Sequence, residues 1–85
     1  MDLLITPKAL KDLAAVPTKE RAAILAEMKG IAADPFRPRS NVKPLVGRRN
    51  EYRLRKGDWR AIYRVEANIG TVTLFRVANR KDAYS

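Results

Sequence analysis

Apolar residues in the first 34 positions recur at the spacing of α-helices. A short apolar run at residues 3–5 is a candidate β-strand. After it, Leu10, Leu13 and Ala14 are spaced to share one helical face. A longer stripe follows and comprises Ile24, Leu25, Met28, Ile31 and Ala32. The pattern predicts a short strand followed by two helices whose apolar faces pack into a core.

The two predicted helices have start and stop signals of their own. Thr6 is suited to cap the first helix, and Pro7 suits its first position because that position needs no backbone N–H. Pro17 ends this helix, and Thr18 is placed to cap the second. An Asp-Pro pair at residues 34–35 ends the second helix. The first part of the chain therefore predicts a helical hairpin.

From Leu45 onward the apolar pattern changes to the period of two that is typical of strands. The preceding residues, 35–44, are basic and rich in proline, and they predict an extended linker or a surface arm. Three strands are predicted, at residues 51–56, 59–66 and 71–77. Successive strands with short turns form an antiparallel meander. We therefore predict one α+β domain over residues 1–85, with the helices on one face of the sheet.

Alternation along the predicted strands separates the two faces of the sheet. The face toward the helices is predicted to contain Tyr52, Leu54, Trp59, Ala61, Tyr63, Val65, Val72 and Leu74. The opposite face is predicted to contain Arg53, Arg55, Arg60, Ile62, Arg64, Thr73, Phe75 and Val77. Arg76 conflicts with this pattern, because strict alternation points it toward the helices. A strand end, an edge position or a bulge would resolve the conflict.

The first turn of the meander sets which side chains oppose each other. A two-residue turn at Gly57-Asp58 places Arg55 opposite Arg60. Like charges directly opposite each other destabilise a sheet. Four arginines on one face, two of them opposed, therefore indicate that an anion normally lies there.

Charge is distributed unevenly between the two parts of the chain. Residues 1–34 contain five basic and five acidic side chains, whereas residues 35–85 contain thirteen basic and four acidic ones. The net charge of +9 therefore lies entirely in the second part. This asymmetry favours a polyanion as the partner, with nucleic acid the natural candidate.

The residue types exclude several classes of function. The chain has no cysteine and no histidine, which excludes disulfides, thiolate chemistry and histidine-based catalysis. The carboxylates are few and scattered, so we predict no metal site and no cofactor. No apolar run approaches the length needed to span a membrane, and we expect a cytoplasmic protein with no membrane partner.

Basic and aromatic side chains gather in two segments, residues 52–63 and 76–84. Arginine forks suit phosphates and can offset the charge of a phosphorane, but they do not lose a proton near neutral pH. Tyr84 is the nearby side chain in the second segment that is suited to proton transfer. Taken singly, each arginine is equally compatible with solvated surface, and Tyr84 with a C-terminal anchor. General electrostatic attraction is expected from Arg37, Arg39, Lys43, Arg48 and Arg49.

These two segments resemble the RelE/ParE superfamily of bacterial toxins from toxin–antitoxin systems. The stretches that match are Tyr52-Arg53-Leu54-Arg55, Gly57-Asp58-Trp59-Arg60, Ile62-Tyr63, and Arg76-Val77-x-Asn79-Arg80 with a following tyrosine. The order of strand, two helices and meander is similar over essentially the whole chain. The resemblance implies a RelE-like fold and an endonuclease that cuts mRNA in the ribosomal A site without a metal.

By position, the resemblance also implies roles for individual residues. The implied catalytic residues are Arg53, Arg55, Arg60, Arg80 and Tyr84. Arg60 and Arg80 would position the phosphate and stabilise the phosphorane, and Tyr84 would orient or deprotonate the 2′-hydroxyl. The products would be a 2′,3′-cyclic phosphate and a 5′-hydroxyl. Supporting RNA contacts are expected from Arg48, Arg49, Lys56, Arg64 and Lys81.

The chain departs from the family pattern at three positions. Asn79 stands where many members have histidine, and Arg53 and Arg55 stand where some members have lysine. A histidine-based mechanism is therefore excluded, and the residue that acts as the general base stays open.

The resemblance implies partners as well as an activity. A cognate antitoxin would fold an acidic C-terminal segment onto the basic face, and the substrate would be mRNA in the ribosomal A site. ParE-like members share the fold but inhibit DNA gyrase by binding, and this is the leading alternative. An inert member that only binds nucleic acid or its antitoxin is a third possibility.

Overall fold

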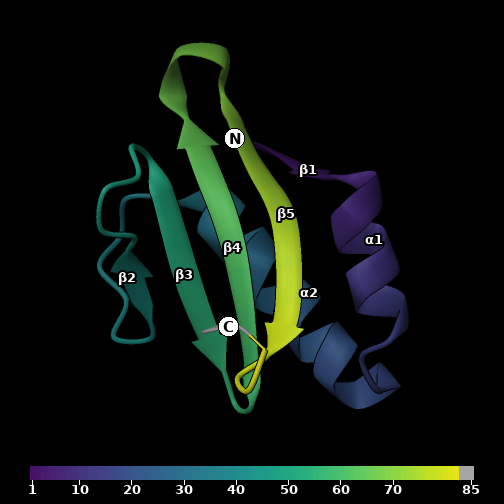
Figure 1. Cartoon of the computed structure of the whole chain (residues 1–85). Coiled ribbons are helices and arrows are strands. Elements are labelled where there is room, and N and C mark those ends of the chain that lie inside the picture. Colours follow the sequence, from purple (N-terminus) through teal and green to yellow (C-terminus); the bar gives the residue numbers. More distant parts are fainter. Residues whose placement is uncertain (83–85) are drawn as a thin grey trace.

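Five strands form one mixed sheet, and two helices cover one of its faces (Figure 1). The computed structural model describes residues 1–82. In chain order the elements are β1 (Asp2–Ile5), α1 (Pro7–Ala14), α2 (Thr18–Ala33), β2 (Val42–Pro44), β3 (Glu51–Lys56), β4 (Trp59–Glu66), the 3-10 turn η1 (Ala67–Ile69) and β5 (Thr71–Asn79). The predicted α+β class, the helical hairpin and the three-stranded meander are confirmed.

The strands lie in the order β1-β5-β4-β3-β2. β1 pairs in parallel with β5, and all other neighbours are antiparallel. The two helices carry the chain from one edge of the sheet to the other. At the second edge, β2 corrects the prediction that residues 35–44 are only a linker or arm. This strand has only three residues, too few for an alternating pattern to reveal it. Its last residue, Pro44, is tolerated because the strand lies at an edge of the sheet.

The predicted start signal is right for the first helix and wrong for the second. The Thr6 hydroxyl accepts a hydrogen bond of 3.1 Å from the backbone N–H of Ala9, so Thr6 caps α1 as expected. Thr18 is instead the first residue of α2, and Pro17 occupies the cap position without any side-chain bond. The backbone N–H of Arg21 donates to the Pro17 carbonyl at 2.8 Å, which is the first backbone hydrogen bond of the helix.

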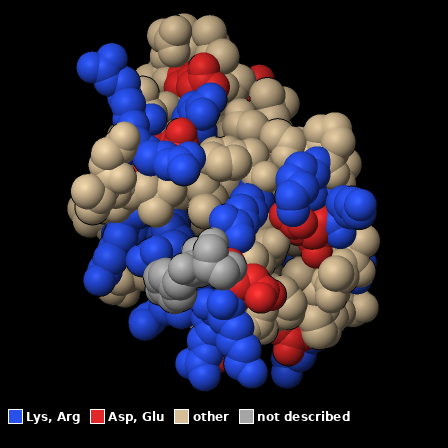
Figure 2. Space-filling model, viewed as in Figure 1, with Lys and Arg blue, Asp and Glu red and all other residues tan. Residues whose placement is uncertain are grey.

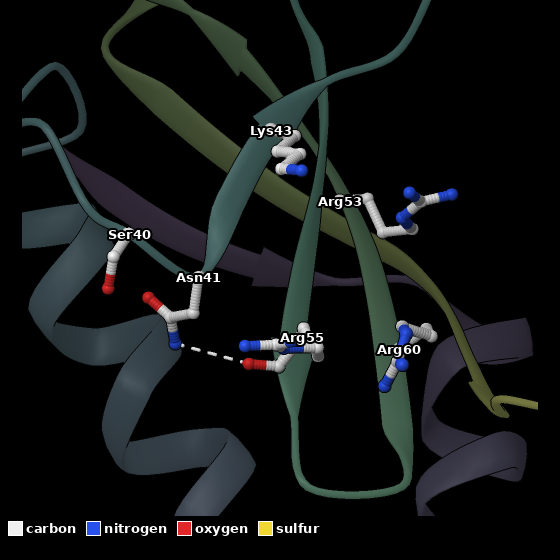
Figure 3. A pocket seen from close by; sticks show the side chains of 6 residues that line it. All are labelled: Ser40, Asn41, Lys43, Arg53, Arg55 and Arg60. Carbon is white, nitrogen blue, oxygen red and sulfur yellow. Dashed lines mark hydrogen bonds between the residues drawn. The ribbon is translucent and has the colours of Figure 1, made fainter.

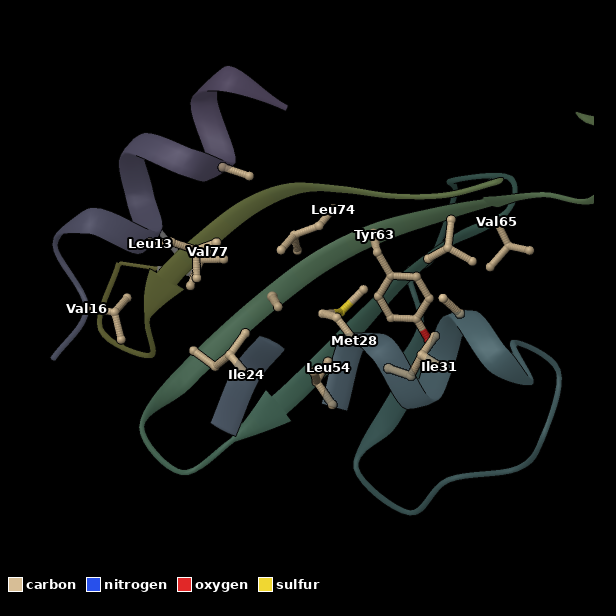
Figure 4. Close-up of a cluster of buried hydrophobic side chains, with 14 residues drawn as sticks. Leu13, Val16, Ile24, Met28, Ile31, Leu54, Tyr63, Val65, Leu74 and Val77 are labelled. Atoms are coloured by element: carbon tan, nitrogen blue, oxygen red, sulfur yellow. The ribbon is translucent and has the colours of Figure 1, made fainter. Parts of the chain in front are cut away.

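A hydrophobic core fills the layer between the helices and the sheet (Figure 4). Its buried members are Ala9, Leu13, Val16, Ile24, Met28, Ile31, Ala32, Leu54, Ala61, Tyr63, Val65, Val72, Leu74 and Val77. The stripe predicted on α2 is confirmed, with Leu25 packed at its margin. On α1 the buried side chains are Ala9 and Leu13. Leu10 and Ala14 are exposed, so the predicted face of this helix is wrong by about one position.

A β-bulge in β5 reverses the predicted orientation of two side chains. Ile62 pairs with Arg76, but its neighbour Tyr63 pairs with Leu74, so Phe75 is an extra residue in β5. One extra residue exchanges the two faces for everything after it. Arg76 consequently shares the open face of the sheet with Ile62, and Val77 is buried in the core. Strict alternation had predicted the opposite for both residues, and the bulge resolves the conflict at Arg76.

The end of β5 beyond the bulge is held by α1. β1 pairs only with residues 71–74, so the outer edge of β5 after Leu74 has no strand beside it. There the backbone N–H of Val77 donates a 3.0 Å hydrogen bond to the carboxylate of Asp12, which also pairs with Lys8. A helix side chain thus takes the place of a neighbouring strand.

We predict that Asp12→Ala lowers the free energy of unfolding by about 1–3 kcal/mol, because it leaves the partly buried Val77 N–H without an acceptor. Lys8→Ala removes only the exposed half of the ion pair and should cost less than about 1 kcal/mol. Urea unfolding of the three proteins measures both effects. Equal losses for the two variants would show that the ion pair, and not the bond to Val77, stabilises this edge.

Tyr63 is the largest buried side chain of the core. Its ring stacks on Tyr52 of the neighbouring strand, with centroids 5.5 Å apart and planes 19° from parallel. The pKa of Tyr63 is raised from 10.0 to about 12: burial is the largest cause, the nearby Tyr52 adds to the rise, and Arg39 partly offsets it. The folded state therefore favours the neutral phenol.

This raised pKa predicts a loss of stability at high pH. The stability that the neutral Tyr63 phenol contributes is fully present below pH 10, the pKa of tyrosine in the unfolded chain, and is lost as the pH rises toward about 12. We expect a fall on the order of 2 kcal/mol in the free energy of unfolding across this interval. Tyr63→Phe should lose that much less than the wild type in urea titrations at pH 9 and pH 11.5. An equal fall in the free energy of unfolding between pH 9 and pH 11.5 for both proteins would contradict the prediction.

Candidate nucleic-acid interface

The face of the sheet opposite the helices is open and basic. In the view of Figure 1 both helices lie behind or beside the sheet. Figure 2 shows that Lys and Arg side chains gather over the part of this face formed by β2, β3 and the adjoining end of β4. A pocket of about 190 Å³ lies there, lined by Ser40, Asn41, Lys43, Arg53, Arg55 and Arg60.

Strand pairing brings the four cations of this pocket together (Figure 3). Arg53 and Arg55 are two residues apart on β3 and therefore share its open face. Arg60 of β4 lies directly opposite Arg55, as the sequence predicted, and Lys43 of β2 lies directly opposite Arg53. We call these four side chains, Lys43, Arg53, Arg55 and Arg60, the basic pocket.

The basic pocket contains two pairs of like charges at directly opposed positions. Such pairs are unfavourable in a sheet unless an anion lies between them. Within residues 1–82, no carboxylate lies within ion-pairing distance of Lys43, Arg55 or Arg60. These positive charges are therefore available to a ligand, and phosphate is an anion whose oxygens fit the paired donors of a guanidinium group.

Hydrogen bonds to the backbone hold the pocket in shape. One terminal nitrogen of Arg60 donates to the carbonyls of Gly57 and Trp59, each at 3.0 Å. This bonding leaves the other guanidinium donors for an anion. On the opposite side, Asn41 accepts from the Arg55 N–H at 2.8 Å and donates to the Arg55 carbonyl at 3.1 Å, which ties the loop before β2 to β3.

Arg80 lies beside the pocket without lining it. It follows β5, and its backbone N–H donates a 2.7 Å hydrogen bond to the carbonyl of Asp58 at the tip of the β3–β4 hairpin. Its guanidinium lies 3.7 Å from the Asp58 carboxylate, and both side chains are largely exposed. This pair is weak and readily exchanged for another anion. Tyr84, the fifth catalytic candidate, lies outside the described residues.

Two of the predicted RNA-binding residues are paired with a buried carboxylate. Glu51, at the start of β3, is only 7% exposed. It lies 3.1 Å from the guanidinium of Arg64 and 3.4 Å from that of Arg48. Arg64 also lies over the ring of Phe75 at 5.7 Å. The structure therefore places Arg64 on the open face but binds its charge internally.

The other three predicted RNA-binding residues lie away from the pocket. Lys56 shares the helix side of the sheet with Trp59 and lies 3.3 Å from Glu27 of α2. Arg49 is exposed in the connection between β2 and β3, and Lys81 is exposed in the turn after β5. None of the three lines the basic pocket.

Sequence reasoning missed Lys43 as a member of the site and treated it only as general attraction. The signal was the pair Val42-Lys43, in which an inward apolar residue precedes an outward basic one. Val42 packs against the core and pairs with Leu54, which turns Lys43 to the open face. Arg76 reaches the same face through the bulge, and its guanidinium donates to the Asp82 carbonyl at 3.1 Å.

Two further features concern metal binding and membrane crossing. In the described part of the chain, no group of three or more carboxylate, histidine or cysteine side chains is placed to hold a metal ion. Neither helix has both the length and the apolar character that crossing a bilayer requires, over residues 1–82.

Comparison with known proteins identifies the family. The model of the ParE toxin of type II toxin–antitoxin systems matches residues 3–84. No curated protein sequence matches significantly.

Three solved structures of antitoxin–toxin complexes contain similar chains. A chain of the RelB–RelE complex from Methanococcus jannaschii is 27% identical with a TM-score of 0.79, over 95% of this chain and 94% of that one. A chain of the RelBE2 toxin–antitoxin complex from Mycobacterium tuberculosis is 28% identical with a TM-score of 0.76, over 93% of this chain and 96% of that one. A chain of the archaeal RelE–RelB complex from Pyrococcus horikoshii is 25% identical with a TM-score of 0.81, over 95% of this chain and 96% of that one.

The family model covers nearly the whole chain, and the sheet and helices agree with the RelE-like fold of these structures. The chain therefore belongs to the RelE/ParE superfamily of toxins from type II toxin–antitoxin systems.

Proposed function

We propose that this toxin is a ribosome-dependent, metal-independent endonuclease that cuts mRNA in the ribosomal A site and so inhibits translation. The observation that carries the proposal is the basic pocket, in which three arginines and one lysine surround a cavity of about 190 Å³ on an open face. A surface that only attracted nucleic acid would not need its cations opposed in pairs around a cavity.

The proposed reaction is attack of a ribose 2′-hydroxyl on the adjacent phosphorus, with a 2′,3′-cyclic phosphate and a 5′-hydroxyl as products. Negative charge builds up on the phosphorane, and preorganised guanidinium groups are suited to offset it. Arg60, held by its two backbone bonds, and Arg80, at the neighbouring hairpin tip, would position the phosphate. Arg53 and Arg55 would add electrostatic support, and Tyr84 would orient or deprotonate the 2′-hydroxyl.

The ribosome would supply what this small pocket lacks. Within residues 1–82, the pocket is lined by side chains from three neighbouring strands of one sheet and from one loop. Holding the 2′-oxygen in line with the departing 5′-oxygen accounts for much of the rate of such a reaction. A codon held in the A site would arrive with that geometry imposed from outside.

A cognate antitoxin is the partner that the family and its solved complexes support. The three similar chains were each solved in a complex with an antitoxin. We propose that an antitoxin segment rich in acidic residues folds onto the open face here and neutralises the basic pocket. Charge complementarity to a chain of net charge +9 would speed this association.

Inhibition of DNA gyrase by binding is the second candidate. One observation favours it, because the family model that matches residues 3–84 is the model of ParE toxins. Under this alternative the basic pocket would have no catalytic part, mRNA would stay intact, and expression would provoke a DNA-damage response.

Arg60→Ala should reduce mRNA cleavage by about 10²–10³-fold, because it removes a preorganised donor to the phosphorane. Primer extension on an mRNA in a purified translation system, with and without ribosomes, measures the effect. Lys29→Ala, which removes one exposed positive charge from α2, is the matched control and should cleave normally.

The outcome separates the two candidates. Cleavage that needs neither ribosomes nor Arg60 would sink the proposed mechanism. If the folded wild type leaves mRNA intact and inhibits gyrase in a supercoiling assay, the binding alternative is correct.

Arg64→Ala should have the opposite profile. Its charge is bound to the buried Glu51, so its loss should lower the free energy of unfolding by about 1–3 kcal/mol and change cleavage by the folded protein less than threefold. Urea unfolding and the same primer-extension assay test both parts. A loss of cleavage as large as that of Arg60→Ala would place Arg64 in the active site.

A further inference from the structure

Of the side chains that line the basic pocket, one is of a type that can donate a proton to a departing alkoxide. An arginine side chain does not lose its proton in proteins, the amide of Asn41 is neutral and does not ionise, and the hydroxyl of Ser40 is a very weak acid. Lys43 carries an ammonium group, which is a competent proton donor. Such a donor accelerates transesterification of RNA, because the departing 5′-oxygen would otherwise leave as an alkoxide.

Contacts of the two preceding residues hold Lys43 in place. Before it, Asn41 forms two hydrogen bonds with the backbone of Arg55. Next to it, Val42 packs against the core and pairs with Leu54. These contacts set the register in which Lys43 lies opposite Arg53, and Figure 3 shows its side chain directed from β2 toward that residue.

Lys43 and Arg60 occupy diagonal corners of the pocket. Arg60 lies opposite Arg55, and Lys43 lies opposite Arg53, two residues further along the same strand. Because β3 lies between β2 and β4, two strand spacings and two residues along the strand separate their backbones by about 12 Å. Two long side chains that extend toward each other can contact one phosphate across this gap. A phosphate bound between these corners would present its non-bridging oxygens to Arg60 and Arg55 and a bridging oxygen to Lys43.

We propose that the ammonium of Lys43 donates a proton to the departing 5′-oxygen during RNA cleavage, an inference that rests on the proposed endonuclease function. The 2′-oxygen forms a bond to phosphorus and its proton passes to water. The bond between phosphorus and the 5′-oxygen breaks, and its electron pair takes a proton from the Lys43 nitrogen. Solvent then returns a proton to the neutral amine, so that one proton has moved from the 2′-hydroxyl to the new 5′-hydroxyl.

The experiment compares two versions of one mRNA in the purified translation system. One version is all-oxygen, and the other carries sulfur in place of the 5′-oxygen at the cleaved bond. Sulfur leaves as a stable thiolate and needs no proton. Lys43→Arg retains the positive charge but donates a proton poorly, and Lys43→Met removes both properties.

Lys43→Arg should cleave the all-oxygen mRNA about 10²–10⁴-fold more slowly than the wild type and the sulfur mRNA within about threefold of it. Lys43→Met should be at least as slow on the all-oxygen mRNA and slower than Lys43→Arg on the sulfur mRNA, because it also removes a positive charge from the pocket. Circular dichroism and urea unfolding establish that each variant is folded. Normal cleavage of the all-oxygen mRNA by Lys43→Arg would overturn the inference. So would an equal loss on both substrates, which would give Lys43 a role in binding alone.

Arg60→Ala keeps the two proposals distinguishable. This variant should be slow on both substrates, because phosphorane stabilisation is needed whichever atom departs. If Arg60→Ala is slow and Lys43→Arg is normal, the endonuclease proposal stands and the role of Lys43 is wrong. If the folded wild type cleaves neither mRNA, the proposed function is wrong and the role of Lys43 is overturned with it.

Discussion

Packing of α2 against a single face of the sheet is the interaction on which the rest of the structure depends. The helix contributes Ile24, Met28 and Ile31 to the core, and the sheet meets them with side chains from β3, β4 and β5. Both helices of residues 1–82 lie on this side, so the second face of the sheet has no described helix to cover it. An uncovered face can contain charged residues at little cost, and this is where the basic pocket lies.

The basic pocket is a local conflict that the remainder of the fold tolerates. Lys43 opposes Arg53 and Arg55 opposes Arg60, although like charges at such positions are unfavourable. Sites where a local preference is violated are frequently functional, since an evolved sequence has little other reason to retain the violation. Binding of a polyanion would relieve the repulsion, so the same arrangement that weakens the isolated sheet favours association with RNA or with an acidic antitoxin segment.

Carboxylates divide the arginines of the open face into two groups. Glu51 lies between Arg48 and Arg64 and satisfies them internally, whereas the described carboxylates leave Arg55 and Arg60 without an ion pair. The bulge at Phe75 also changes which arginines lie on the open face, because it buries Val77 and moves Arg76 to that face. A count of positive charges along the strands does not distinguish these groups. The positions of a few acidic residues and one extra residue in β5 do.

The sequence alone determined the types of the elements other than β2, the antiparallel meander, the facing of Arg55 and Arg60 and the location of the positive charge. All of these follow from periodicity, turn chemistry and composition, which act over a few residues at a time. Tertiary structure decided the pairing of β2 with β3, the bulge in β5, the bond from Val77 to Asp12 and the internal pairing of Arg64. Each of these depends on contacts between segments distant in sequence, and no local pattern encodes which distant partner a strand edge, a backbone N–H or a guanidinium will find. Lys43 therefore looked like one more surface charge until β2 placed it opposite Arg53.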